Sequence, residues 1–137
     1  MGNAVSDPLI LLVEDEPLVL LVAQDALEAG GYAVLPVTSG PEAVAALDRQ
    51  HRDLVGLVTD IRLGSPPSGW EVARHARELR GDLPVVYTTA DSAPDWSVQG
   101  VPNSAVVQKP YAGAQLLTAI STLITAATTT GADPKRD

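Results

Sequence analysis

Four side chains of this chain could do chemistry together: the carboxylates of Glu14, Asp15 and Asp60 and the ammonium group of Lys109. Carboxylates that lie close together repel one another unless a cation lies among them. Oxygen ligands favour a hard ion such as Mg²⁺, and a lysine can neutralise a phosphoryl group during its transfer. These residues therefore predict phosphoryl transfer to a carboxylate. Asp60 is the best candidate acceptor because it stands alone after an apolar run.

The elements that must position these side chains follow from the hydrophobic pattern. Short apolar runs alternate with helical patterns, which is typical of a mostly parallel sheet covered by helices on both faces. The runs predict strands at residues 9–13, 32–37, 54–59, 84–88 and 104–108. The helical patterns predict helices at residues 17–29, after a cap at Ser39, at 70–79 and at 111–126.

The stretch between the fourth and fifth predicted strands is less regular. Residues 91–103 contain Pro94, Gly100 and Pro102. Proline and glycine interrupt helices, so we expect a short or irregular fourth helix of about one or two turns.

In such a sheet, ligands bind outside the carboxyl ends of the strands. Glu14 and Asp15 follow the first predicted strand, and Asp60 follows the third. Thr89 and Lys109 follow the fourth and the fifth. We therefore expect three carboxylates, a hydroxyl and an ammonium group to converge on one edge of the sheet.

Two of these positions also have a purely structural interpretation. Carboxylates favour helix N-termini, so Glu14 and Asp15 could form an acidic turn before the helix that begins at Pro17. Thr89 could be a strand-end hydroxyl bonded to the backbone. The joint presence of Asp60 and Lys109 favours the chemical interpretation.

Length and composition limit the function classes. The chain has 137 residues, the size of one domain, which we place at residues 9–126 between an N-terminal extension (1–8) and a polar C-terminal tail (127–137). It has no cysteine, which excludes thiolate metal sites and cysteine nucleophiles. The net charge of −8 argues against binding nucleic acid. No apolar run predicts a membrane span or signal peptide, so we expect a cytoplasmic protein.

Four short motifs carry a family resemblance, which extends over residues 9–124. They are Glu14-Asp15-Glu16-Pro17, Thr59-Asp60-Ile61-Arg62, Thr89-Ala90 and Lys109-Pro110-Tyr111, each directly after a predicted strand. In this order they resemble the receiver domain of bacterial two-component response regulators. The resemblance implies a flavodoxin-like, doubly wound sheet of five parallel strands in the order 2-1-3-4-5.

The resemblance also implies a phosphoacceptor and a metal site. Asp60 would accept a phosphoryl group from a phosphohistidine on a sensor histidine kinase or a histidine phosphotransfer protein. Asp15 and Asp60 would bind Mg²⁺, Glu14 would bind it through water, and the backbone carbonyl of Arg62 would complete the protein ligands.

Three further groups would bind the phosphoryl group in a receiver. The Thr89 hydroxyl and the Ala90 N–H would donate hydrogen bonds to its oxygens, and Lys109 would form an ion pair with it.

Several positions depart from the common receiver pattern. Receivers often have proline four residues after the acceptor, where this chain has Gly64. Many have an aromatic switch residue shortly before the lysine, where this chain has Val106 and Val107. Tyr87 or Trp96 could substitute for that switch. These departures do not affect the residues expected to carry out phosphorylation. They concern how phosphorylation is passed on through the fourth helix and the fifth strand.

The first predicted helix has more apolar residues than one buried face requires. Its expected core face is Val19, Val22, Ala23, Ala26 and Leu27. This leaves Leu18, Leu20 and Leu21 with at least one side toward solvent, and clustered exposed apolar side chains mark contact sites. In receivers this helix docks the histidine-bearing partner, so we expect Leu20 and Leu21 to contact it.

We therefore expect a stand-alone receiver that catalyses only its own phosphorylation and dephosphorylation, and that signals through a downstream protein or a phosphorelay. It should be monomeric when unphosphorylated. The alternative is a receiver-like interaction module that works without phosphorylation. A flavin carrier is excluded because the acidic turn after the first strand would repel a phosphate, and Arg62 stands where an aspartyl-phosphate hydrolase has a second aspartate.

Overall fold

The apolar runs at residues 9–13, 54–60 and 85–89 form strands whose side chains are almost all buried, as strands inside a parallel sheet require. The structure is a computed structural model that describes residues 7–131. Its strands are β2 (Leu9–Val13), β3 (Ala33–Val37), β4 (Leu54–Asp60), β5 (Val85–Thr89) and β6 (Ser104–Gln108). All neighbouring strands pair in parallel, in the order β3-β2-β4-β5-β6. Numbered along the chain this is 2-1-3-4-5, which confirms the predicted flavodoxin-like fold.

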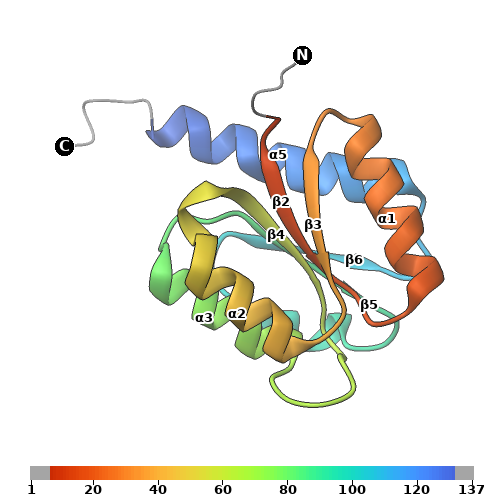
Figure 1. The fold of residues 1–137 in the computed structure, drawn as a ribbon. Helices are drawn as coiled ribbons and strands as arrows, with labels where there is room; N and C mark the ends of the chain where they lie inside the picture. Colours follow the sequence, from red (N-terminus) through yellow and green to blue (C-terminus); the bar gives the residue numbers. More distant parts are fainter. Residues whose placement is uncertain (1–6, 132–137) are drawn as a thin grey trace.

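Helices cover both faces of this sheet (Figure 1). They are α1 (Pro17–Ala29), α2 (Gly40–Gln50), α3 (Gly69–Leu79), α4 (Trp96–Gln99) and α5 (Gly113–Gly131), with 3₁₀ turns η1 (His51–Asp53) and η2 (Ala93–Asp95). Helices α1 and α5 pack on one face, and α2 and α3 lie on the other. No helix within residues 7–131 is both long and apolar enough to cross a membrane.

The length of α4 agrees with the sequence prediction, whereas α5 is longer than predicted. Helix α4 is a single turn, as the proline and glycine residues around it predicted. Helix α5 continues past Ala126, the predicted end, to Gly131. The threonines after Ala126 lower helix propensity without breaking a helix, and no proline or glycine intervenes before Gly131. Residues 1–6 and 132–137, in the predicted extension and tail, lie outside the described residues.

Side chains of the interior strand β2 alternate between two cores. Ile10 and Leu12 pack toward α1 and α5, whereas Leu11 and Val13 pack toward α2 and α3. All four are at most 2% exposed. This double burial fixes β2 inside the sheet, between β3 and β4, and holds the residues that follow Val13 at the carboxyl edge.

The core face of α1 differs from the prediction. Ala23 and Leu27 are buried, and Leu20 is half buried against the same core. Val22 is instead 52% exposed. The predicted assignment of Val22 to the core is therefore wrong, because nearly every residue of the first two turns is apolar and their spacing does not select one face.

The start of α3 is locked against the strand that carries Asp60. Ser68 and Glu71 form a capping box, in which each side chain accepts a hydrogen bond from the other residue's backbone N–H. The N–H of Gly69 donates to the carbonyl of Ile61 over 2.8 Å. A Cβ atom at Gly69 would collide with the backbone carbonyl of Asp60. The absence of a side chain at this position is what allows the close approach.

Candidate functional site

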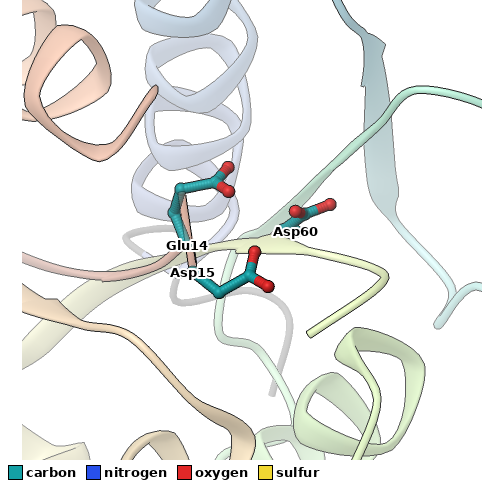
Figure 2. Close-up of side chains that lie close together, drawn as sticks. All are labelled: Glu14, Asp15 and Asp60. Carbon is teal, nitrogen blue, oxygen red and sulfur yellow. The ribbon is translucent and has the colours of Figure 1, made fainter. Parts of the chain in front are cut away.

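Three carboxylates meet at the carboxyl edge of the sheet. Glu14 and Asp15 directly follow β2, and Asp60 is the last residue of β4. Figure 2 shows their side chains directed toward a common centre, and one oxygen of each lies within 4.8 Å of the others. Glu14 and Asp60 are buried, at 2% and 6% exposure, whereas Asp15 is exposed. The strand ends thus bring these predicted residues together.

Lys109 reaches this cluster from the loop after β6. Its Nζ lies 3.0 Å from Asp60 Oδ2, 3.0 Å from Glu14 Oε1 and 3.3 Å from Glu16 Oε1. Its backbone N–H donates to the carbonyl of Thr89 over 2.7 Å, which joins the ends of β5 and β6. The Lys109–Pro110 peptide bond is cis. One ammonium group therefore contacts three carboxylates. The sequence analysis did not predict the contact with Glu16.

The single positive charge of Lys109 does not balance the negative charges of the carboxylates around it. Burial and the neighbouring charge of Asp60 raise the pKa of Glu14 to about 7. Burial also raises the pKa of Asp60, even though the hydrogen bond from Lys109 opposes the rise. Burial disfavours the charged form of Lys109, but the bonds to Glu14 and Asp60 outweigh it and raise the pKa of this lysine. Such a site favours binding of a further cation.

The donor set fits Mg²⁺. Glu14, Asp15 and Asp60 offer oxygen ligands only, which suits a hard ion. Gly64, where many receivers have proline, has a φ of +85°, a conformation that favours glycine. A Cβ atom there would lie 3.9 Å from Asp15 Oδ2. Gly64 therefore lets the loop after β4 turn beside the carboxylate that is exposed to solvent.

The hydroxyl of Thr89 is engaged by the loop that follows β5. Its Oγ1 accepts the backbone N–H of Ser92 over 2.8 Å and that of Asp91 over 3.2 Å. Thr89 is 1% exposed, and Ala90 directly after it is exposed. The structure thus shows the strand-end bonding that was the alternative interpretation of this threonine, while the hydroxyl hydrogen stays available for donation.

The side chain of Arg62 bridges two loops at this edge. Its Nε donates to Asp91 Oδ1 over 3.0 Å, and this bond lowers the pKa of Asp91. Ser92 Oγ donates to the same oxygen over 3.1 Å. The bridge connects the loop after β4 with the loop after β5. The sequence carries no signal for it, because the partners are far apart along the chain and both lie in loops.

The two aromatic candidates for a switch are both held in place. Tyr87 is fully buried, its hydroxyl accepts the backbone N–H of Val101 over 3.0 Å, and its ring lies 4.7 Å from that of Trp70. Trp96 Nε1 donates to Ser104 Oγ over 2.9 Å. Neither side chain is directed into solvent with a free polar group.

An apolar groove lies beside the acidic site. It has a volume of about 490 Å³ and is lined by Leu18, Val19, Val22, Ala90, Lys109, Pro110 and Tyr111. Leu18 is 78% exposed and Leu21 is 55% exposed on the same helix. Of the two predicted docking residues, Leu21 is therefore available to a partner, and Leu20 is half buried.

Comparison with known proteins assigns the family. The sequence profile of the response regulator receiver domain matches residues 10–121. The chain is 39% identical over 109 residues to the alginate biosynthesis transcriptional regulatory protein AlgB of Pseudomonas aeruginosa, covering 78% of this chain and 24% of that protein. It is 28% identical over 118 residues to the response regulator SaeR of Staphylococcus aureus, covering 85% and 50%. The chain thus spans between a quarter and half the length of these relatives.

Solved structures agree with this assignment. A response regulator receiver protein from Sinorhizobium medicae WSM419 superposes with a TM-score of 0.84 at 42% identity, covering 88% of this chain and 96% of that one. The receiver domain of sensor histidine kinase PA1611 from Pseudomonas aeruginosa, with a magnesium ion coordinated in its active site cleft, has a TM-score of 0.75 at 26% identity, covering 88% and 99%. Fold, profile match and site residues all agree: the chain belongs to the response regulator receiver domain family.

Proposed function

We propose that this chain accepts a phosphoryl group on Asp60 from a phosphohistidine, in a Mg²⁺-dependent reaction. The donor is a sensor histidine kinase or a histidine phosphotransfer protein. The receiver acts as a cytoplasmic module that signals through a downstream protein or a phosphorelay. It catalyses only its own phosphorylation and dephosphorylation.

The observation that carries this proposal is the position of Lys109. Its Nζ contacts Asp60 and Glu14 at 3.0 Å each, beside carboxylate oxygens that fit a divalent cation. A solvated lysine or a simple acidic cap on α1 would not require a partly buried ammonium group between two buried carboxylates. The arrangement suits a site in which a doubly charged group arrives at Asp60 and needs neutralisation.

In the proposed reaction an Asp60 carboxylate oxygen attacks the phosphorus atom, and the bond from phosphorus to the imidazole nitrogen breaks with its electron pair leaving on the imidazole. Mg²⁺, held by Asp15 and Asp60, by Glu14 through water and by the Arg62 carbonyl, would supply charge neutralisation. Lys109 would pair with the phosphoryl oxygens.

Thr89 and Ala90 would bind the phosphoryl group from the end of β5. The Thr89 hydroxyl hydrogen is available while its oxygen accepts from the loop. The backbone N–H of Ala90 is at the next position. Both residues precede the loop that carries Asp91, so binding there would alter the hydrogen bonds of that loop.

The phosphodonor would dock on α1 beside the site. Leu21, Leu18 and the groove next to Lys109 form an exposed apolar surface, on which a helix that carries the phosphohistidine could pack. Leu21→Ala should slow phosphotransfer from a cognate kinase, whereas Ala45→Gly on the opposite face should not. An unchanged rate for Leu21→Ala would remove Leu21 from the docking surface.

Intact-mass measurement after incubation with acetyl phosphate tests the proposal directly. We expect a gain of one phosphoryl group in the presence of Mg²⁺ and no gain after its removal with a chelator. Asp60→Asn should abolish the gain, and Asp91→Asn, at an exposed carboxylate outside the metal cluster, should retain it. A gain that persists in Asp60→Asn would contradict the assignment of the acceptor.

The second candidate is a receiver-like interaction module that functions without phosphorylation. The valines at 106 and 107 and the hydrogen bond that holds Tyr87 favour it, because the positions before Lys109 have no aromatic residue and Tyr87 is held in place. Such a module has no need of a metal ion. Failure to gain a phosphoryl group together with failure to bind Mg²⁺ would support this candidate over the first.

A further inference from the structure

The apolar groove beside the acidic site begins at the groups that are proposed to bind the phosphoryl group. Two of its lining residues, Ala90 and Lys109, are the same residues whose backbone N–H and ammonium group would contact that group. The Nζ atom of Lys109 lies 3.0 Å from Asp60 Oδ2. A molecule that places its phosphoryl end at Asp60 therefore has the groove next to its other end.

The remainder of the groove is apolar. Its wall on α1 is formed by Leu18, Val19 and Val22, and the loop after β6 adds Pro110 and Tyr111. Leu18 is 78% exposed and Val22 is 52% exposed. These two side chains thus present uncovered apolar surface directly beside a site for a charged group.

The charge and the size of the groove limit what it can bind. Of the described residues that line it, only Lys109 carries a charge, and this charge is positive. The groove volume of about 490 Å³ lies within the range of small-molecule sites. The groove therefore suits a small molecule that has an anionic end near Lys109 and an uncharged, apolar end along α1.

We propose that this groove binds the acyl chain of a small acyl phosphate, so that the chain prefers phosphodonors with a longer apolar acyl group, such as butyryl phosphate, over acetyl phosphate. This inference rests on the proposed function, because it concerns the donor that serves the same acceptor. It assigns to Leu18 and Val22 a part in selecting the donor.

The reaction with such a donor balances without a further reactant. An Asp60 carboxylate oxygen forms a bond to phosphorus, and the bond from phosphorus to the bridging acyl oxygen breaks. The electron pair of that bond stays on the acyl oxygen, and the acyl group leaves as a free carboxylate. Acetyl and butyryl phosphate share this chemistry and differ only in CH₂ groups remote from the reacting atoms.

The expected preference follows from the area that the groove covers. Complete burial of one CH₂ group corresponds to a gain in affinity of about fourfold. Butyryl phosphate has two more CH₂ groups than acetyl phosphate, and an open groove covers them only in part, so we expect a total gain of roughly fivefold. The chain makes the same contacts before and during transfer. The gain should therefore lower the half-saturating donor concentration and leave the maximal rate unchanged.

Initial rates of phosphoryl gain, measured by intact mass at saturating Mg²⁺, test this inference. Acetyl, propionyl and butyryl phosphate are each varied in concentration with the full chain. We expect the half-saturating concentration to fall in that order, to a total of roughly fivefold, with similar maximal rates.

Three variants assign the effect to the groove. Leu18→Ser and Val22→Ser each remove apolar surface from the wall on α1 and should reduce the difference between acetyl and butyryl phosphate to less than about twofold. Val98→Ser is the matched control, because Val98 is 82% exposed and does not line the groove. It should keep the full difference. All three positions are exposed, and thermal unfolding confirms that each variant is folded.

The outcomes separate this inference from the function on which it rests. Equal half-saturating concentrations for acetyl and butyryl phosphate would overturn the inference and leave the proposed function intact, with the groove then covered only by a protein donor. A preference that Val98→Ser reduces as strongly as Leu18→Ser and Val22→Ser would overturn the assignment to the groove. No phosphoryl gain from any of the three donors would overturn the inference together with phosphorylation by small donors.

Discussion

The acidic site and the segment from α4 to the start of β6 (residues 96–104) hold their polar groups in different ways. In the site, Glu14 and Asp60 are buried around Lys109, and the pKa values of both carboxyl groups are raised. In the segment, Trp96 donates a hydrogen bond to Ser104, and the backbone N–H of Val101 donates to the hydroxyl of Tyr87 in β5. The site thus holds carboxylates whose mutual repulsion a bound cation would reduce. The polar groups of the segment are instead paired with one another or with neighbouring residues.

This difference indicates where a phosphorylation signal would leave the site. A locked α4–β6 segment cannot report through the rotation of an aromatic side chain. The loop after β5 is better placed, because Thr89 holds the N–H groups of Asp91 and Ser92 and Arg62 bonds to Asp91. A phosphoryl group that accepts a hydrogen bond from the Thr89 hydroxyl would change the bonds from Asp91 and Ser92 to Thr89 first.

The largest expected effect follows from removal of the Lys109 ammonium group, which contacts two buried carboxylates. Lys109→Met leaves Glu14 and Asp60 buried without a partner, and breaking a buried ion pair in this way costs about 3–5 kcal/mol of unfolding free energy. The loss should be largest near pH 8 in chelator and smaller near pH 6, because protonation of carboxyl groups with raised pKa values relieves the repulsion. Urea denaturation at both pH values measures this.

Arg49→Met, at an exposed position of α2, is the matched control and should change the unfolding free energy by less than about 0.5 kcal/mol. Equal losses for both variants, or a loss for Lys109→Met that does not depend on pH, would contradict the description of the site as a cluster of uncompensated charge.

A smaller effect is expected at the glycine that lies against the acceptor strand. Gly69→Ala would push a methyl group into the carbonyl of Asp60 and should cost about 1–3 kcal/mol of unfolding free energy, with slower phosphorylation as Asp60 shifts. Gly81→Ala is the control, because a Cβ there meets nothing within 4 Å. If the two alanine variants are equally stable, the close approach at Gly69 does not constrain the site.

The segment can be tested without touching the site. Tyr87→Phe removes the acceptor of the Val101 N–H and should cost about 1–3 kcal/mol, because a buried donor is left unsatisfied. Tyr32→Phe removes a half-buried hydroxyl bonded to Ser121 and should cost less. Chemical denaturation of both variants measures the difference. A larger loss in Tyr32→Phe would show that the Tyr87 bond does not lock the segment.

The smallest expected effect is on metal affinity. Without metal the pKa of Glu14 is about 7, so near neutral pH part of it is protonated. It must lose this proton before its carboxylate can bind Mg²⁺ through water. The Mg²⁺ dissociation constant should therefore rise as the pH falls below 7, by up to about tenfold per pH unit. Titration calorimetry between pH 8 and pH 5.5 measures it. In Glu14→Gln the Mg²⁺ dissociation constant should depend less on pH above pH 6. An equally steep dependence in this variant would show that the proton is lost from another group.

The sequence predicted the parts of this molecule that depend on chain order. Strands of buried apolar residues alternate with helices, so the topology places Glu14, Asp15, Asp60 and Lys109 at one edge, and the structure brings these four together. The α1 face was mispredicted because an almost wholly apolar helix has no periodic contrast.

Other features depend on geometry that no local pattern encodes. The bond between Arg62 and Asp91 joins two loops whose path is set by the strands between them. The contact of Gly69 with Asp60 depends on how α3 packs against β4. The bond from Val101 to Tyr87 requires the turn before β6 to lie over β5. Such contacts arise only once the elements are packed.

The rate of phosphoryl gain from acetyl phosphate at saturating Mg²⁺, compared between Lys109→Met and Tyr87→Phe, tests the central claim most directly. We expect Lys109→Met to lose roughly 100-fold or more in rate, as for removal of one group that stabilises developing charge, and Tyr87→Phe to retain the wild-type rate. Equal losses in the two variants would contradict the separation of the site from the α4–β6 segment. An unchanged rate in Lys109→Met would contradict the proposed chemistry itself.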